Sequence, residues 1–497
     1  MQKEILINVE PQEKRVAVIE GNALEEYYIE RPSEVSLVGN VYKGTVNSVM
    51  SGIGAAFVDI GFGKNGFLYV TDMMSPAREF DLLETSSHHS HHTPRPKPSD
   101  IDKLVKKGQE VLVQVVKEPI GNKGPRLTTH VGLPGRFVVL MPFDHHMGIS
   151  KKVIDHAERE RLRQILKKIM PNFDMGLIVR TAGVGKNESD FRREIRYLAA
   201  LWRNIKNRST KIKAPNLVNE EYSLTFRILR DIFSEDVTRV LVDNRDEYKK
   251  LMHFANNMMP SMKRKLILYQ EKTSLFDSRG IEKEVEKLYN KKIALKCGGY
   301  IFIEETEGLI AIDVNSGSFN KKHMEETAFK VNSEAAIEIA RQIRMRDVGG
   351  IVIVDFIDMM REKHNREIFD ILVNMFKKDR AKINILKMSE FGIVQMTRQR
   401  IRRGVRKVSY KDCPYCHGRG SVKSATTMAI EVLRAIKKQI EKTRLKEVRS
   451  YVHPEVANYM LNEDRPAIAK LESFYKTRIV IIAELEMHIE NFRIEIM

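Results

Sequence analysis

YIFIEETEGLIAIDVNSGSF, residues 300–319, and GGIVIVDFIDM, residues 349–359, are the two segments that decide the fold of the chain. The first contains two apolar, β-rich runs, at 301–305 and 309–314, separated by a Thr-Glu-Gly turn signal, and it therefore predicts a β-hairpin. The second contains an unbroken apolar run at 351–354, which is typical of a strand buried on both faces.

A helix is predicted between these two segments, over residues 325–346. Small and apolar side chains recur there at helical spacing, and the pair Gly349-Gly350 that follows is a stop signal. A strand, a helix of crossover length and a second strand favour a parallel pair whose carboxyl ends share one edge of a sheet. The residues that set the helical spacing are Ala328, Val331, Ala335, Ile339 and Ile343.

Each of the two predicted strands ends on an aspartate, Asp313 in the first and Asp355 in the second. Asn315 follows the first aspartate, and Asp358 lies just beyond the second. Carboxylates that converge at a strand edge suit a hydrated Mg²⁺, which proteins commonly hold with one or two carboxylates plus a substrate phosphate. The alternative is that these side chains cap strand ends or form a solvated surface, and their spacing leaves both interpretations open.

Composition and charge favour a large protein that binds a polyanion. The chain has 497 residues, which is enough for about three or more domains with a sizeable core. Lys and Arg number 84 against 66 Asp and Glu, giving a formal net charge of +18. This charge indicates nucleic acid as the simplest partner, with a generic basic soluble protein as the alternative.

The cysteine content and the N-terminus indicate the compartment. Three cysteines, two of them in a CxxC motif, do not form a disulfide framework and fit a reducing compartment with a metal or redox pair. Residues 1–9 lack a signal-peptide pattern, because Glu4 and Asn8 interrupt the apolar run. No stretch reaches the roughly 18 apolar residues of a membrane span. We therefore expect a cytoplasmic protein with no membrane partner.

The first 128 residues read as β structure. Residues 1–36 predict two short strands and a turn, too small for a core of their own, so they must pack on a later part of the chain. Residues 37–128 predict a small Greek-key barrel of the OB type. Four strands are expected in it, at residues 39–46, 54–60, 66–69 and 111–117. Phe57 and Phe67 fall on two of these strands, where they are either core residues or rings for base stacking.

Four long motifs strongly resemble the bacterial ribonuclease E/G family. They are AIDVNSG at 311–317, EAAIEIARQIRMRDVGGIVIVDFIDM at 334–359, SEFGIVQMTRQR at 389–400 and CPYCHGRG at 413–420. The resemblance covers nearly the whole chain, and the length fits a short member that has no long disordered scaffold. It implies that Asp313 and Asp355 hold a catalytic Mg²⁺, and that Asn315 positions the scissile phosphate or the attacking water.

The resemblance also implies an activity. The expected enzyme is an Mg²⁺-dependent endoribonuclease that cuts A/U-rich single-stranded RNA to 5′-phosphate and 3′-hydroxyl products. Its expected work is ribosomal RNA maturation and messenger RNA decay. Two alternatives of other classes are a non-catalytic RNA-binding assembly protein and a structure-specific DNA nuclease.

The family fold is a multidomain α/β (α+β) arrangement. An OB-type S1 RNA-binding barrel is inserted in a ribonuclease-H-like subdomain, and a DNase I-like catalytic α/β domain, a zinc-link and a small C-terminal α/β domain follow. The expected divisions are 1–36 and 220–280 for the ribonuclease-H-like subdomain, 37–128 for the barrel, 129–219 for a 5′-phosphate sensor region, 281–403 for the catalytic domain, 404–420 for the zinc-link and 421–497 for a C-terminal oligomerisation domain.

The barrel motifs VYKGTV, AAFVDIG and NGFLYV resemble the S1-type RNA-binding barrel. This resemblance favours base stacking by Phe57 and Phe67. Lys43 and Lys117 are expected to meet RNA phosphates.

Arg180-Thr181, after the apolar run in MGLIVRTAG, can hold a terminal monophosphate by charge-assisted hydrogen bonds. The family senses an RNA 5′-monophosphate with this motif. A surface ion pair of Arg180 is the alternative. Lys151-Lys152 stand where the family often has arginines, and lysine lacks the bidentate fork.

Cys413 and Cys416 supply two of the four ligands that a structural zinc needs. In the family two chains each donate such a pair to one shared Zn²⁺, which implies a homodimer or homotetramer. A redox pair is the alternative, but we see no thioredoxin-like βαβ context around the motif. Cys297 is expected to be a small buried residue.

Two further stretches are rich in basic or histidine side chains. The polar, proline-rich segment 85–100 predicts a disordered barrel loop whose histidines either bind stray metal or are solvated. A basic run near residue 400 either lines RNA phosphates at helical spacing or forms a solvated face. That run consists of Arg398, Arg400, Arg402, Arg403, Arg406 and Lys407.

Overall fold

The chain folds into two compact units, Met1–Val408 and Ser409–Met497. The structure, a computed structural model, describes residues 2–21, 23–32, 36–74, 100–119, 123–145, 147–169, 174–306, 308–317, 324–399, 404–442 and 446–496. Residues 85–99 of the histidine-rich segment lie outside the described residues. In the described ranges, no helix combines the length and apolar character that crossing a bilayer requires.

A five-stranded sheet joins the N-terminus to the middle of the chain, in the order β15-β14-β1-β2-β3. Its strands are β1 (Lys3–Val9), β2 (Lys14–Glu20), β3 (Ala23–Glu30), β14 (Val237–Val242) and β15 (Leu266–Leu268). β1 pairs in parallel with β14, so the prediction that the N-terminal strands pack on a later segment is confirmed. The prediction of two strands was one too few, because the two buried residues of β3, Leu24 and Tyr27, lie three positions apart and so do not give the alternation that marks a strand.

Helices cover both faces of this sheet. They are α5 (Leu224–Ile232) and α6 (Arg245–Met258) on one face, and α7 (Leu275–Ser278) and α8 (Ile281–Lys287) on the other. Alternate residues of β1 account for the two cores: Ile5 and Ile7 pack against α5 and α6, whereas Leu6 packs against α7 and α8. Successive side chains of a strand point to opposite faces of the sheet, so a strand that is apolar at every position can be buried on both sides.

Strands within residues 41–128 form a closed five-stranded barrel. Its strands are β4 (Val41–Met50), β5 (Ala55–Asp59), β6 (Gly66–Tyr69), β7 (Glu110–Lys117) and β8 (Arg126–Thr128). The order β4-β5-β6-β8-β7 closes through a β4–β7 pairing, and β13 (Asn216–Asn219) joins β4 from outside. All four strands predicted for this region are present. The short helices α1 (Thr71–Met74) and α2 (Ile101–Leu104) also lie in this part of the chain.

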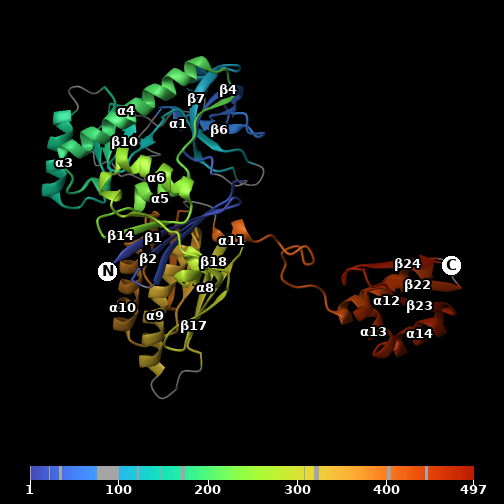
Figure 1. Ribbon diagram of the computed structural model, residues 1–497. Coiled ribbons are helices and arrows are strands. Elements are labelled where there is room, and N and C mark those ends of the chain that lie inside the picture. The colour runs from blue at the N-terminus through green and yellow to red at the C-terminus, as the bar shows by residue number, and fades with distance from the viewer. Residues whose placement is uncertain are drawn as a thin grey trace. The chain divides into compact units, whose positions relative to one another are not determined.

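A four-stranded sheet and two long helices form the next layer. The sheet has the order β11-β12-β10-β9, with strands β9 (Leu133–Pro134), β10 (Val138–Met141), β11 (Met147–Ile149) and β12 (Gly176–Val179). The helices are α3 (His156–Ile169) and α4 (Glu188–Lys211), and Figure 1 shows both around this sheet. The 24-residue α4, which begins at an Asn187 capping box, was not predicted.

A six-stranded sheet contains the strands of segments 300–319 and 349–359. Its order is β16-β17-β18-β19-β21-β20, with β16 (Lys292–Ala294), β17 (Tyr300–Glu305), β18 (Leu309–Asn315), β19 (Gly350–Asp355), β20 (Ile383–Ile385) and β21 (Ile393–Arg398). The predicted β17–β18 hairpin, the connecting helix α9 (Met324–Met345) and the parallel pairing of β18 with β19 are all confirmed. α9 and α10 (Glu362–Phe376) cover one face (Figure 1).

The opposite face of this sheet, which we call the open face, exposes the other half of each strand's side chains. Ile312 and Val354 are buried against the helices, whereas their neighbours Asp313 and Asp355 are exposed. Register places Phe302, Asp313, Asp355 and Ile393 in one row across four strands of the open face.

The second unit is a small α/β fold with a three-stranded sheet in the order β23-β22-β24. It contains α12 (Ala425–Lys442), β22 (Glu447–Val452), α13 (Pro454–Asn462), α14 (Arg465–Tyr475), β23 (Arg478–Ala483) and β24 (Phe492–Ile496). Because β22 and β23 are parallel and two helices connect them, this is a βαβ unit that follows the CxxC motif. The expectation that no such unit accompanies the motif was wrong.

Candidate functional site

Asp313 and Asp355 lie directly opposite each other in the parallel β18–β19 pair. Both are the last or nearly last residues of their strands, and both are exposed on the open face. Their strands are neighbours because α9 returns the chain to the same sheet. The structure therefore brings together two carboxylates that are 42 residues apart by their numbers in the sequence.

Asn315 lies two residues beyond Asp313 on β18, on the same side of the strand. Its side-chain Nδ2 donates a hydrogen bond of 2.5 Å to Oδ2 of Asp313. This bond fixes one oxygen of the carboxylate, and among the described residues no hydrogen bond occupies the other, which is therefore available to a ligand. The three sequence-predicted catalytic residues thus form one cluster.

The cluster has an excess of negative charge. Partial burial raises the pKa of the Asp355 carboxyl, and the charges of Asp313 and Asp358 raise it further. Like charges held close together disfavour ionisation of both groups unless a cation joins them. The donor set, two exposed carboxylates and a neighbouring amide, therefore fits a hard divalent cation such as Mg²⁺.

Two side chains of α9 hold the loop that follows Asp355. The buried amide of Asn332 donates to the Ile357 carbonyl at 2.8 Å and accepts from the Ile357 N–H at 3.1 Å. Glu325 accepts from the backbone N–H groups of Met360 and Arg361. We did not predict either role, although an asparagine within the apolar stripe of a helix was a readable signal.

The barrel places Phe57, Phe67 and Lys117 in one row across its outer surface. Phe57 pairs with Phe67, Phe67 with Arg126, and Arg126 with Lys117. The two rings are partly exposed, with centroids 4.7 Å apart, while the alternate residues of β5 and β6 fill the core. Arg126 is a fourth member that sequence reasoning missed, because its strand is only three residues long.

Lys43 does not belong to this row. Phe57 pairs with Ser48 of β4, and Lys43 lies five residues away along that strand. Its ammonium group lies 2.7 Å from the Glu110 carboxylate and donates to the Ile212 carbonyl. The charge of Lys43 is therefore already balanced by the protein.

Arg180 and Thr181 follow β12, at the end where Lys151 and Lys152 follow its parallel partner β11. The lysines and Thr181 are exposed. Arg180 uses Nη1 to donate to the Gly135 carbonyl at 2.6 Å and to the Asp231 carboxylate at 2.8 Å. In the described part of the chain, these bonds occupy only Nη1, which leaves Nε and Nη2 for an anion.

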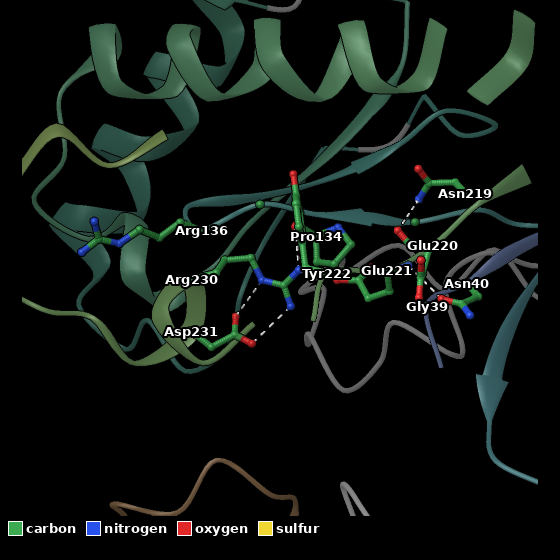
Figure 2. Close-up of polar contacts among 12 residues, drawn as sticks. Gly39, Asn40, Pro134, Arg136, Asn219, Glu220, Glu221, Tyr222, Arg230 and Asp231 are labelled. Atoms are coloured by element: carbon green, nitrogen blue, oxygen red, sulfur yellow. Dashed lines mark hydrogen bonds and ion pairs between the residues drawn. The ribbon is translucent and has the colours of Figure 1, made fainter. Parts of the chain in front are cut away.

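Arg180 is part of a largely buried ionic cluster that also contains Asp231, Arg230 and Glu221. Burial alone would raise the pKa of the Asp231 carboxyl, but the guanidinium groups of Arg230 and Arg180 outweigh it and hold that pKa below its usual range. Figure 2 shows Arg230 contacting both oxygens of Asp231. Arg230 also donates to Glu221 at 2.8 Å, and the Glu221 N–H donates to Asn40 at the start of the barrel.

The CxxC motif lies in the second unit, before α12. Cys416 is buried and its sulfur accepts a hydrogen bond from the Gly420 N–H at 3.3 Å, whereas Cys413 is exposed. Hydrogen bonds from the backbone of Cys416 and Tyr415, and then from the Cys416 side chain, lower the pKa of the Cys413 thiol. A thiolate serves both zinc binding and redox chemistry. Within the described ranges, no group of three or more metal-binding side chains occurs.

Arg398 neither lines RNA phosphates nor belongs to a solvated face, so both interpretations of the basic run are wrong for this residue. Arg398 lies on β21 with its side chain 3% exposed, 2.8 Å from Asp379 and 2.8 Å from Asp347. Burial of a cation requires such partners. Arg400, Arg402 and Arg403 lie outside the described residues, as do the side chains of Arg406 and Lys407.

Comparison with known proteins agrees with this architecture. Residues 132–401 match the Ribonuclease E/G family, residues 37–129 match the S1 RNA binding domain, and residues 412–497 match the thioredoxin-like domain of RNase E/G. The match to a thioredoxin-like domain is consistent with the parallel β22–β23 pair and the two helices that connect these strands. The chain also aligns along its full length with curated proteins.

An S1 barrel joined to a ribonuclease domain that displays paired carboxylates defines an RNA-binding endoribonuclease, and the chain belongs to the ribonuclease E/G family. Within that family it is most like ribonuclease G. It is 38% identical to ribonuclease G of Salmonella typhimurium and 37% identical to that of Escherichia coli K12, with 100% of each chain covered. Ribonuclease E of Escherichia coli K12 is 36% identical over 99% of this chain but only 46% of its own length.

Proposed function

We propose that the enzyme cuts single-stranded RNA at the Asp313–Asp355 cluster with Mg²⁺ as cofactor. The observation that carries the proposal is the direct pairing of the two exposed aspartates on adjacent parallel strands. When bound there, Mg²⁺ would polarise the scissile phosphate and lower the pKa of an attacking water. Asp313 and Asp355 hold the cation, and Asn315 orients Asp313 through its hydrogen bond. The proposed products carry a 5′-phosphate and a 3′-hydroxyl.

The barrel is the proposed RNA clamp. Phe57 and Phe67 offer partly exposed rings on which bases stack, and Lys117 meets a phosphate beside them. Arg126 adds a cation in the same row, although it already pairs with Asp72. Lys43 contacts phosphate only if RNA displaces Glu110. The proposed substrates are A/U-rich single strands in ribosomal RNA precursors and messenger RNA.

Arg180 and Thr181 form the proposed pocket for a 5′-monophosphate. Nε and Nη2 of Arg180, which make no hydrogen bond to any described residue, and the exposed Thr181 hydroxyl can bind phosphate oxygens together. Lys151 and Lys152 add charge from the adjacent strand end. The guanidinium of Arg180 is held in place by Asp231, so the pocket is preformed.

The second unit supports a proposed zinc link. Cys413 and Cys416 supply two thiolates, and a partner subunit would complete a closed tetrahedral site. The assembly proposed is a homodimer or homotetramer of a cytoplasmic enzyme. We also propose that the chain is divided into the seven parts expected from the family resemblance. The sheet that combines residues 3–30 with 237–268 supports a barrel inserted within a ribonuclease-H-like subdomain.

Cleavage of one short A/U-rich RNA tests this function. The oligomer carries either a 5′-monophosphate or a 5′-hydroxyl, and each form is incubated with and without Mg²⁺. We expect cutting that requires Mg²⁺ and is faster with the monophosphate. Cutting that is indifferent to the 5′ end would remove the sensor and keep the catalytic cluster. Folded, zinc-loaded protein that binds the RNA without cutting it would favour the alternative, an RNA-binding assembly protein.

A further inference from the structure

Phe391 is an exposed aromatic side chain at the edge of the catalytic cluster. Its side chain is 77% exposed, and within the described residues no other ring and no cation contacts it. It lies two residues before Ile393, which pairs with Asp355. Two residues of extended chain span at most about 7 Å, so the backbone of Phe391 lies close to the acidic cluster.

Hydrogen bonds close the turn that carries Phe391. The Gly392 N–H donates to the Ser389 carbonyl at 3.1 Å, and the Ser389 N–H donates to the Ile393 carbonyl at 2.9 Å. The Ile393 N–H donates in addition to the Ser389 hydroxyl at 3.2 Å. Gly392 has a φ of +71°, which suits glycine. Because the backbone of the turn is already ordered, binding of a ligand has to order only the side chain of Phe391.

The same turn lies against the loop of Asp358. A methyl group added to Gly392 would lie 3.2 Å from the Phe356 carbonyl and 3.7 Å from Oδ1 of Asp358. Met360, two residues after this aspartate, is 96% exposed although Glu325 holds its backbone. Two exposed apolar side chains thus flank an acidic cluster on segments that contact each other.

We infer that Phe391 is a base-stacking subsite for a nucleotide next to the scissile phosphate, with Met360 as its apolar border. An RNA strand whose phosphate reaches Asp313 and Asp355 must place its flanking nucleotides over the surrounding surface. An exposed ring there gains by stacking on a base, and every base offers a π-face. The subsite therefore binds nucleobases without reading their edges, and purines stack more strongly because their rings are larger.

This inference rests on the proposed catalytic cluster. It is tested with Phe391→Ala, Phe391→Leu and Phe391→Trp on RNAs that carry a single abasic nucleotide at each of four positions around the cut. On intact RNA, Phe391→Ala should lower kcat/KM about five- to 150-fold, mainly through KM. Phe391→Leu should lose nearly as much because it lacks a ring, whereas Phe391→Trp should retain activity.

The abasic substrates separate stacking from a structural role. At one flanking position, removing the base should slow the wild type and abolish the difference between wild type and Phe391→Ala. A loss of the same size on every substrate, or no loss at all, would overturn the subsite. Phe474→Ala is the matched control, since Phe474 is also 77% exposed but lies in the second unit.

Two other outcomes are distinguishable. If Phe391→Ala changes the oligomeric mass of the protein, a second copy of the chain covers this surface and the inference is wrong. If Asp313→Asn cuts as fast as the wild type, the proposed cluster fails, whatever Phe391 does.

Discussion

Asn315 donates a hydrogen bond to the carboxylate of Asp313, two residues earlier on the same strand. The carboxylate is thereby oriented beside Asp355, its neighbour in the parallel pair. The arrangement resembles the outer-sphere support that holds metal-binding side chains in other enzymes.

Replacement of Asn315 by alanine should lower kcat by about 10- to 100-fold, because outer-sphere partners of metal ligands contribute factors of this size. RNA binding, measured by fluorescence anisotropy, should change little. Raising the Mg²⁺ concentration should recover part of the loss if the amide acts by orienting Asp313. An Asn315→Ala enzyme with wild-type kcat at every Mg²⁺ concentration would contradict this role.

Asp355→Asn should stabilise the metal-free protein at neutral pH. The folded-state pKa of Asp355 is raised by burial and by Asp313 and Asp358, so ionised Asp355 opposes folding above that pKa. As the pH falls below the carboxyl's ordinary pKa, the aspartate is protonated in both states and the gain should vanish. Urea unfolding in EDTA at pH 7 and pH 3.5 measures this. Asp370→Asn is the control, because Asp370 lies on the exposed surface of α10. An equal gain in the free energy of unfolding for this variant would show that repulsion by Asp313 and Asp358 is not the cause.

Arg180→Ala should abolish the preference for a 5′-monophosphate and leave the slow cleavage of 5′-hydroxyl RNA nearly unchanged. Arg180→Lys should keep part of the preference, since lysine retains the charge and loses the fork. The ratio of initial rates on the two RNAs reports this directly. Arg192→Ala, on the surface of α4, should leave the ratio as it is. Loss of both activities together would show that Arg180 is structural.

Arg398→Ala should destabilise the first unit by about 3–5 kcal/mol, because it leaves the buried Asp379 carboxylate without its partner. Arg192→Ala is again a suitable control, since its ion pair with Glu188 is exposed and worth at most about 0.5 kcal/mol. Chemical denaturation followed by circular dichroism compares the two. Similar small losses in both variants would mean that the Arg398 pair contributes little.

Cys413→Ser should remove bound zinc and reduce the oligomeric mass. The shared site predicts one Zn²⁺ for every two chains, measured by elemental analysis alongside native mass spectrometry. A dimer that persists without zinc would refute the link and favour the redox interpretation of the motif.

Local patterns in the sequence predicted much of the catalytic sheet. The β17–β18 hairpin, α9 and β19 follow from apolar runs, helical spacing and turn signals, all of which act over a few residues. The pairing of Asp313 with Asp355 could only be inferred, because it depends on which strands become neighbours. The Phe57–Phe67–Arg126–Lys117 row depends in the same way on barrel register.

Other misses had signals that were present in the sequence. Helix α4 carries apolar residues at helical spacing, with Phe191, Ile195 and Leu198 buried on one face. The basic run of Arg398 allows helical spacing, whereas the structure has a strand there, β21, whose alternation places Val394, Met396 and Arg398 on the buried side. The alternation of buried and exposed positions in residues 393–398 is visible in the sequence and could have predicted a strand. The two aspartate partners of Arg398 come from distant segments and could not.

Single-turnover cleavage of a 5′-monophosphorylated A/U-rich RNA by Asp313→Asn, at saturating enzyme and with Mg²⁺ varied, tests the central claim most directly. The account predicts RNA binding close to that of the wild type and a cleavage rate at least about 100-fold lower. Cleavage by Asp313→Asn at the wild-type rate, with the same Mg²⁺ dependence, would show that the Asp313–Asp355 pair is not the catalytic site.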